Sequence, residues 1–347
     1  MIMARRPGAR ATSLALGVAV IALTACTARS SSATAADNLQ GAGSTLVAPL
    51  VAAWASDYAA KAGTTVTYGA FGSSYGIGAI SQGTVDFGAS DAPLSGYQLA
   101  SGGGLVQIPW ALTATVLSYQ IQGIAGGLRL TPETVAGIFL GTLQYWDDPS
   151  IAAINPKLHL PHERIAPVFR SDGSGDTYAF TSYLTKTNEQ WRTGIGASTV
   201  VPFPVGQAAQ GNSGVAAAIK NTPGSIGYVS LAYALGNHLP TTAIRNQAGR
   251  FATPGIRGIA AAAATVTRVP AGNAISIVNP PPSAPTAYPI STFTYVIVST
   301  HSPQGTMLRK FIFYGLTSGQ AFGPKLGFAP IPHVVLVAAE KTLTQIK

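Results

Sequence analysis

Residues 165–184 read IAPVFRSDGSGDTYAFTSYL, a stretch that contains a strand, a turn and the start of a helix. The apolar run at 165–169 predicts a buried strand, and residues 178–184 predict a helix. The turn between them, residues 170–177, combines glycine and serine with Arg170. Such a turn presents free backbone N–H groups and the positive end of a helix dipole. It is suited to a tetrahedral oxyanion, although a plain polar turn with a helix cap would also explain it.

Two further turns share this composition. Residues 41–45 read GAGST and precede a helical pattern of apolar and aromatic residues at every fourth position from 46 to 58. Residues 71–76 read FGSSYG and follow a predicted strand. Asp91 comes directly after another predicted strand. Because ligands of α/β sheets bind beyond the carboxyl ends of strands, these segments together indicate one binding site.

Strands and helices alternate along the chain. Strands are predicted at 64–68, 85–89, 105–108, 114–121, 165–169, 225–229 and 288–298, and helices at 46–62, 77–80, 130–140, 178–184, 212–220, 304–316 and 333–343. Thr131 is expected to cap the helix at 130–140, with Pro132 as its first residue and Gly141 as its stop. This alternation predicts an α/β protein with largely parallel sheets.

The composition describes a globular chain with an ordinary core. It has 347 residues, of which 47% are hydrophobic and 10% charged, and this length allows two domains. The net charge of +9 falls to +6 once Arg5, Arg6 and Arg10 leave with residues 1–25. The remaining cations are scattered rather than clustered, so we expect no nucleic-acid partner.

The N-terminus has the organisation of a lipoprotein export signal. Three arginines precede an apolar segment at 13–23, which is too short to span a membrane. Residues 23–26 read LTAC, which resembles the lipobox of bacterial lipoproteins, with Cys26 as the lipidated residue. We expect a signal peptide at 1–25, the lipidated Cys26 with a flexible tether at 26–37, and an anchor on the outer face of the bacterial cell membrane.

One pattern suggests an enzyme. Residues 72–76, GSSYG, match the G-x-S-x-G nucleophile elbow of hydrolases, which would make Ser74 a nucleophile. The acid and base it requires would come from Asp172 or Asp176 and from His301 or His333. The pattern is short and common in glycine-rich chains, so we predict no catalytic residue.

Metal and cofactor signals are weak. His159 and His162 lie three residues apart, but Pro161 argues against a helix that would bring them onto one face. We predict no metal and no cofactor, and the sequence contains no P-loop motif. The four tryptophans lie in apolar surroundings, so we predict that they pack in the core: Trp54, Trp110, Trp146 and Trp191.

The motifs together resemble one family. The chain resembles the periplasmic phosphate-binding proteins, the substrate-binding lipoproteins of bacterial phosphate ABC transporters. The resemblance rests on GAGST at 41–45, GSS at 72–74, VDFGASDAPLS at 85–95 and RSDGSG at 170–175, and continues through WDD at 146–148, FTSYL at 180–184, GNSG at 211–214 and GSIGYV at 224–229. It covers nearly the whole chain after the tether.

The resemblance implies the two-lobed α/β periplasmic-binding-protein fold of type II, with two crossover strands as a hinge. Lobe I would comprise residues 38–112 and 286–347, and lobe II residues 113–285. The implied function is extracytoplasmic, high-affinity binding of inorganic phosphate and its delivery to the permease of the ABC importer, without chemistry on the ligand. We expect a monomer.

The resemblance also implies the ligand contacts. Hydroxyl and N–H groups would come from Thr45 and Ser73, and an N–H from Leu46. Asp91 would accept a hydrogen bond from a protonated phosphate oxygen. Arg170 would bind phosphate and pair with a neighbouring carboxylate. Ser174 and Gly175 would supply the N-terminal donors of a helix.

Asp176 departs from the family pattern, in which a threonine is common at this position. An ionised Asp176 donates only its backbone N–H, because its side chain accepts hydrogen bonds. If it faces the ligand, the site requires a second proton on phosphate or a proton of its own. Alternatively, Asp176 turns away and caps a helix that begins at Thr177.

Asp91 suggests a rule of selectivity. As the one acceptor among donors, it would favour phosphate, which keeps a proton near neutral pH, over sulfate, which has none to give. The competing functions are the hydrolase, a binding protein for sulfate, molybdate or arsenate, and a surface sensor or adhesin that uses phosphate as a signal.

Overall fold

The computed structural model describes residues 38–101 and 103–347, which fall within one compact unit. The predicted signal peptide, Cys26 and the tether lie outside these residues. No helix among the described residues has the length and apolar character needed to cross a bilayer.

The main sheet has eight strands in the order β2-β1-β3-β11-β4-β8-β6-β7, and a small second sheet has the order β10-β9-β5. The strands are β1 Asn38–Gly43, β2 Thr65–Ala70, β3 Phe87–Ser90, β4 Leu105–Gln120, β5 Arg129–Leu130, β6 Ala166–Arg170, β7 Gln207–Ala209, β8 Ser225–Ser230, β9 Ala243–Arg245, β10 Phe251–Ala252 and β11 Ser291–Ser299.

Parallel strands form the two ends of the main sheet, and antiparallel strands form its middle. β1 lies parallel to β2 and β3, and β6 lies parallel to β7 and β8. Between these groups, β11 runs antiparallel to β3 and β4, and β4 runs antiparallel to β8. The prediction of largely parallel sheets was therefore wrong for the centre, because the chain leaves along β4 and returns along β11 in the opposite direction.

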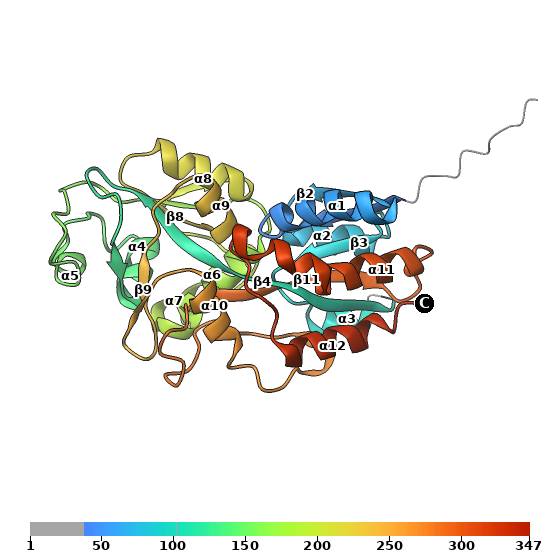
Figure 1. Ribbon diagram of the computed structural model, residues 1–347. Helices are drawn as coiled ribbons and strands as arrows, with labels where there is room; N and C mark the ends of the chain where they lie inside the picture. The colour runs from blue at the N-terminus through green and yellow to red at the C-terminus, as the bar shows by residue number, and fades with distance from the viewer. Residues whose placement is uncertain (1–37, 102) are drawn as a thin grey trace, which may run out of the picture. The chain divides into compact units, whose positions relative to one another are not determined.

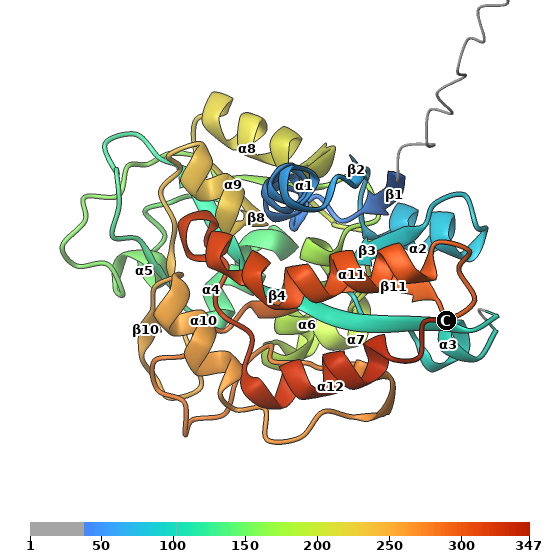
Figure 2. The same cartoon turned by 45° about the vertical axis from the view of Figure 1, so that its right-hand side comes forward.

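β4 is the structural link between the two ends of the sheet. Its residues 105–114 pair with β11 and its residues 115–120 pair with β8, and both views show it running from one group of elements to the other (Figures 1 and 2). Two separate strands were predicted here. They join because Pro109 lies at a register shift, where Tyr295 pairs with Pro109 and Thr294 with Ala111.

Twelve α-helices surround the sheets in the described part of the chain. They are α1 Ala48–Ala62, α2 Ser73–Ser81, α3 Gly96–Ser101, α4 Pro132–Leu140, α5 Pro149–Ala152, α6 Gly175–Thr187, α7 Glu189–Gly194, α8 Gly211–Asn221, α9 Leu231–Gly236, α10 Ile256–Ala263, α11 Gly305–Leu316 and α12 His333–Leu343. Short 3₁₀ turns occupy Ala271–Asn273, Ser318–Phe322 and Pro324–Leu326.

The predicted helix signals act as expected. Thr131 caps α4 by accepting a hydrogen bond from the Thr134 N–H, Pro132 is its first residue, and Gly141 ends it in the left-handed conformation at φ 78°. Gly63 ends α1 in the same way at φ 70°. α2 begins four residues earlier than predicted, at Ser73, which places this serine at a helix N-terminus.

The apolar residues form two large clusters. One consists mainly of residues from 39–111 and 296–346, and the other mainly of residues from 112–295. All four tryptophans are fully buried, which confirms the predicted core role. Trp54 and Trp110 pack edge to face in the first cluster, with ring centroids 5.1 Å apart, and Phe139 and Phe180 do so in the second at 4.7 Å.

Candidate functional site

Arg170, the last residue of β6, is the centre of a buried ion-pair network. Its Nε donates to Asp172 Oδ1 at 2.8 Å and its Nη2 pairs with Asp172 Oδ2. Its Nη1 donates to Asp176 Oδ2 at 2.9 Å. The Arg170 side chain is only 1% exposed. A guanidinium has five N–H groups, so two remain for a further acceptor.

The two carboxylates differ in environment. Burial tends to raise the pKa of Asp172, but hydrogen bonds from Arg170 and the Gly211 N–H leave it below its usual value. Burial raises the pKa of Asp176, although Arg170, Thr115 and Asn212 all oppose the rise. Asp176 is thus deeply buried but well supplied with donors: Thr115 Oγ1 lies 2.7 Å from its Oδ1, and Asn212 Nδ2 lies 2.6 Å from its Oδ2.

The interpretation of Asp176 as a helix cap was wrong. The cap of α6 is Ser174, whose hydroxyl accepts from the Thr177 N–H at 3.4 Å, so the helix begins at Gly175 and Asp176 lies in its first turn. In the first turn of α6, Asp176 lies close to Arg170 at the end of β6. Its carboxylate therefore pairs with the Arg170 guanidinium instead of capping the helix. A short-range capping rule does not include this tertiary contact.

Gly175 lies directly against residues from the first half of the chain. Its N–H donates to Ser73 Oγ at 3.0 Å. A Cβ atom at this position would come within 2.4 Å of Asp91 Oδ2, so the approach requires glycine. The turn after β6, the N-terminus of α2 and the end of β3 therefore meet at one point.

Asp91 is 2% exposed and follows β3. Its Oδ2 accepts from Ser44 Oγ at 2.6 Å and from Ser73 Oγ at 3.4 Å. Its Oδ1 is buried and has no hydrogen-bond partner among the described residues. Burial and then the charge of Asp176 raise the pKa of Asp91 to about 7, against the lowering effects of Ser44, Thr294 and Arg170. An oxygen in this position suits a ligand that donates a proton.

Thr45 and Leu46 lie in the turn between β1 and α1, and both are buried. Thr45 Oγ1 accepts from the backbone N–H of Asn212 at 3.3 Å and from its Nδ2 at 2.8 Å. The Leu46 N–H, predicted as a ligand donor, donates to Ser44 Oγ at 3.0 Å. The fold thus gathers all eight predicted site residues into one buried region.

The polar contributors that were not predicted as site residues include Ser44, Thr115 and Asn212. Ser44 and Asn212 belong to motifs that carried the family resemblance, which is a signal that could have indicated them. Thr115 has no local signal, because it lies within the apolar strand β4 and reaches Asp176 only through the packing of α6 on the sheet.

The geometry does not assemble a hydrolase at Ser74. Ser74 lies inside α2 rather than on a strained elbow, and its hydroxyl donates to Thr199 Oγ1 at 3.0 Å. Asp172 and Asp176 are engaged by Arg170. His301 lies beside Gly104, just before β4 begins.

His162 pairs with Asp147 at 3.0 Å, and the described residues contain no group of three or more His, Cys, Asp or Glu placed to hold a metal ion.

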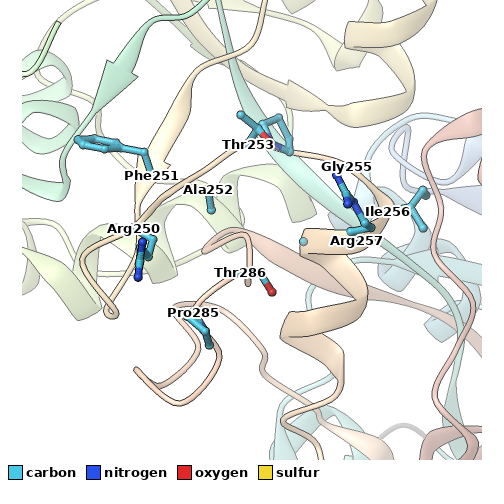
Figure 3. A pocket seen from close by; sticks show the side chains of 11 residues that line it. Arg250, Phe251, Ala252, Thr253, Gly255, Ile256, Arg257, Pro285 and Thr286 are labelled. Carbon is cyan, nitrogen blue, oxygen red and sulfur yellow. The ribbon is translucent and has the colours of Figure 1, made fainter.

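A cavity of about 820 Å³ lies elsewhere, beside the N-terminus of α10 (Figure 3). Its lining includes Arg250 and Arg257 with Thr253 and Thr286, and all four of these side chains are exposed. Exposed polar groups are already hydrated and do not select an ion by desolvation. The buried network at Arg170 and Asp91 is therefore the candidate site.

Comparison with known proteins assigns the chain to a superfamily and to a family within it. The model of the PBP superfamily domain matches residues 28–318. A phosphate-binding protein PstS from Xylella fastidiosa (strain 9a5c) is 36% identical over 85% of this chain and 81% of its own length. One from Haemophilus influenzae is 35% identical over 90% of this chain and 94% of its own. The chain belongs to the PBP superfamily and, within it, to the family of the phosphate-binding proteins PstS.

A solved structure supports the fold. The periplasmic phosphate-binding protein PfluDING, solved with bound phosphate, matches with a TM-score of 0.71 and 23% identity over 88% of this chain and 93% of its own. This similarity shows the two-lobed α/β fold predicted from the sequence.

Proposed function

We propose that this protein binds inorganic phosphate outside the cytoplasm with high affinity and delivers it to the permease of an ABC importer. It performs no chemistry on the ligand. The single observation that carries the proposal is Asp91, a buried carboxylate that receives hydroxyl donors on Oδ2 and has no partner on Oδ1 among the described residues. Such a site favours a tetrahedral anion that retains a proton. The names of the relatives agree with this chemistry.

In this proposal, lobe I comprises residues 38–112 and 286–347, and lobe II residues 113–285. The two apolar clusters, which divide the chain close to these limits, support the assignment. β4 and β11 would then be the crossover strands. Domain closure about such strands is a common way to enclose a ligand.

Phosphate would lie between the two groups of site residues. Lobe I would supply the Thr45 hydroxyl and, once it turns from Asp91 to the ligand, the Ser73 hydroxyl, with the Leu46 N–H shared between Ser44 and the ligand. Asp91 would accept the phosphate proton.

Lobe II would supply the free N–H groups of Arg170, the Ser174 hydroxyl and the Asp176 N–H at the start of α6, with the Gly175 N–H shared between Ser73 and the ligand. The carboxylate of Asp176 would stay with Arg170, Thr115 and Asn212, so that only its backbone N–H faces the ligand.

The first test is a calorimetric titration of the chain from residue 37 onward with phosphate, sulfate and arsenate. We expect phosphate to bind roughly 5 to 150 times more tightly than sulfate, because an unpaired buried acceptor costs about 1–3 kcal/mol. Arsenate, which is also tetrahedral and protonated, is expected to compete with phosphate. Equal affinities for phosphate and sulfate would contradict the proposal.

We also propose that the protein is exported, lipidated at Cys26 and monomeric. Replacing Cys26 by Ala removes the only thiol that can carry the lipid. The variant is expected to leave the membrane fraction after cell fractionation and to bind phosphate as before. Retention of the variant in the membrane would show that another segment anchors the protein.

A further inference from the structure

Asn212, the second residue of α8, is fully buried and connects three segments of the chain. Its Nδ2 donates to Thr45 Oγ1 at 2.8 Å and to Asp176 Oδ2 at 2.6 Å. Its Oδ1 accepts from the Ser230 N–H at 2.6 Å. Because a backbone N–H can only donate, this contact fixes which end of the amide is oxygen.

These contacts decide the orientation of the Thr45 hydroxyl. Its oxygen accepts hydrogen bonds from both the N–H and the Nδ2 of Asn212. A hydroxyl has two acceptor lone pairs and one proton, so both lone pairs are engaged and the proton points elsewhere. The Thr45 hydroxyl is therefore oriented to donate a hydrogen bond to the ligand. Every oxygen of a tetrahedral oxyanion can accept such a bond.

The same side chain joins residues that lie far apart in the sequence. Thr45 belongs to the turn after β1, whereas Asp176 and Ser230 belong to the part of the chain between β4 and β11. The amide also holds the Asp176 carboxylate beside Arg170. One residue therefore links the donors of the first group to the ion pairs of the second.

We propose that Asn212 is a positioning residue that makes Thr45 a donor to the bound anion and ties the two lobes together around it. This inference rests on the proposed function and adds a residue that acts through Thr45 rather than on the ligand. Loss of Asn212 leaves the Thr45 hydroxyl free to rotate and removes a contact between the lobes. Phosphate then dissociates faster.

The experiment is a double-mutant cycle in the full chain, with Asn212→Ala, Thr45→Val and the double variant. Phosphate affinity is measured by calorimetry and the release rate by stopped-flow fluorescence. We expect Asn212→Ala alone to weaken binding about tenfold, mainly through faster release, as the loss of one buried hydrogen bond predicts. In the Thr45→Val background, Asn212→Ala is expected to weaken phosphate binding further by less than about threefold.

Ser213→Ala is the matched control, because Ser213 is the exposed next residue of α8 and should bind phosphate like the unmodified chain. If Asn212→Ala fails to fold, Asn212→Asp keeps the contact with Ser230 but replaces the Nδ2 donor by an oxygen, which shares a proton with Asp176 Oδ2 and leaves none for Thr45. Thr45 must then donate to residue 212 instead of to phosphate, and a loss of at least tenfold is expected.

Two results would overturn the inference while leaving the proposed function intact. One is an unchanged affinity and release rate in both Asn212 variants. The other is an equal weakening by Asn212→Ala with and without Thr45→Val, which would mean that Asn212 does not act through Thr45. Failure of the unmodified chain to bind phosphate would instead contradict the proposed function.

Discussion

Replacing Asp91 by Asn is expected to raise the affinity for sulfate at least about fivefold and to lower that for phosphate. The amide oxygen can keep the hydrogen bond with Ser44, while the amide nitrogen takes the place of the unpartnered Oδ1. A sulfate oxygen then meets a donor instead of a carboxylate, which removes a penalty of about 1–3 kcal/mol or more. Calorimetric titration of both anions at fixed salt measures the change.

The pKa of Asp91 supplies a second measurement on the unmodified protein. Because burial and the charge of Asp176 raise this pKa to about 7, Asp91 takes up a proton as the pH falls from 8 to 6. A protonated Asp91 can donate, so sulfate affinity should increase over this range in the unmodified chain and stay flat in Asp91→Asn. Unchanged selectivity in the variant would argue that Asp91 does not contact the ligand.

The same raised pKa has a consequence for stability. Between about pH 4 and pH 7 the folded protein holds a proton on Asp91 that the unfolded chain releases. This linkage favours the folded state at the acidic end of the range and is lost as the pH rises through 7.

Replacing Arg170 by Met is expected to destabilise the protein by about 3–5 kcal/mol and to abolish phosphate binding. The substitution leaves the buried carboxylate of Asp176 and the partly buried carboxylate of Asp172 without their cation. Breaking a buried ion pair by removing one partner costs far more than the pair contributes, because the remaining charge is uncompensated. Urea unfolding, with the slope checked for two-state behaviour, measures the loss.

A matched control and a rescue make this prediction specific. Arg192→Met removes an exposed partner of Glu189 and should change stability little. Asp176→Asn in the Arg170→Met background removes one buried charge and should restore part of the stability without restoring binding. If the double variant is no more stable than Arg170→Met, the loss arises from packing rather than from uncompensated charge.

Local signals predicted most of the longer helices well, although α6 extends beyond the predicted residues at both ends. α12 spans the predicted residues, and α4 begins and ends at its predicted cap and stop. Short elements such as α5 and β10 were missed, because four or two residues do not show a period. The centre of the sheet was predicted wrongly for a related reason: the direction of β11 depends on its partners and not on its own pattern.

At the site, local patterns in the chain indicated which turns carry donors and that Asp91 follows a strand, whereas the prediction that Asp91 accepts from the ligand came from the resemblance. Glycine, serine and a helix N-terminus act locally, so their chemistry is visible in a short window. The role of Asp176 follows from contacts that form only on folding. Whether it caps a helix or pairs with Arg170 depends on the distance between a strand end and a helix start, together with Thr115 and Asn212 from two other elements. That arrangement follows from the packing of α6 and α8 on the sheet. Side chains that meet only through folding show no periodic or local pattern in the sequence, so the sequence could not predict these contacts.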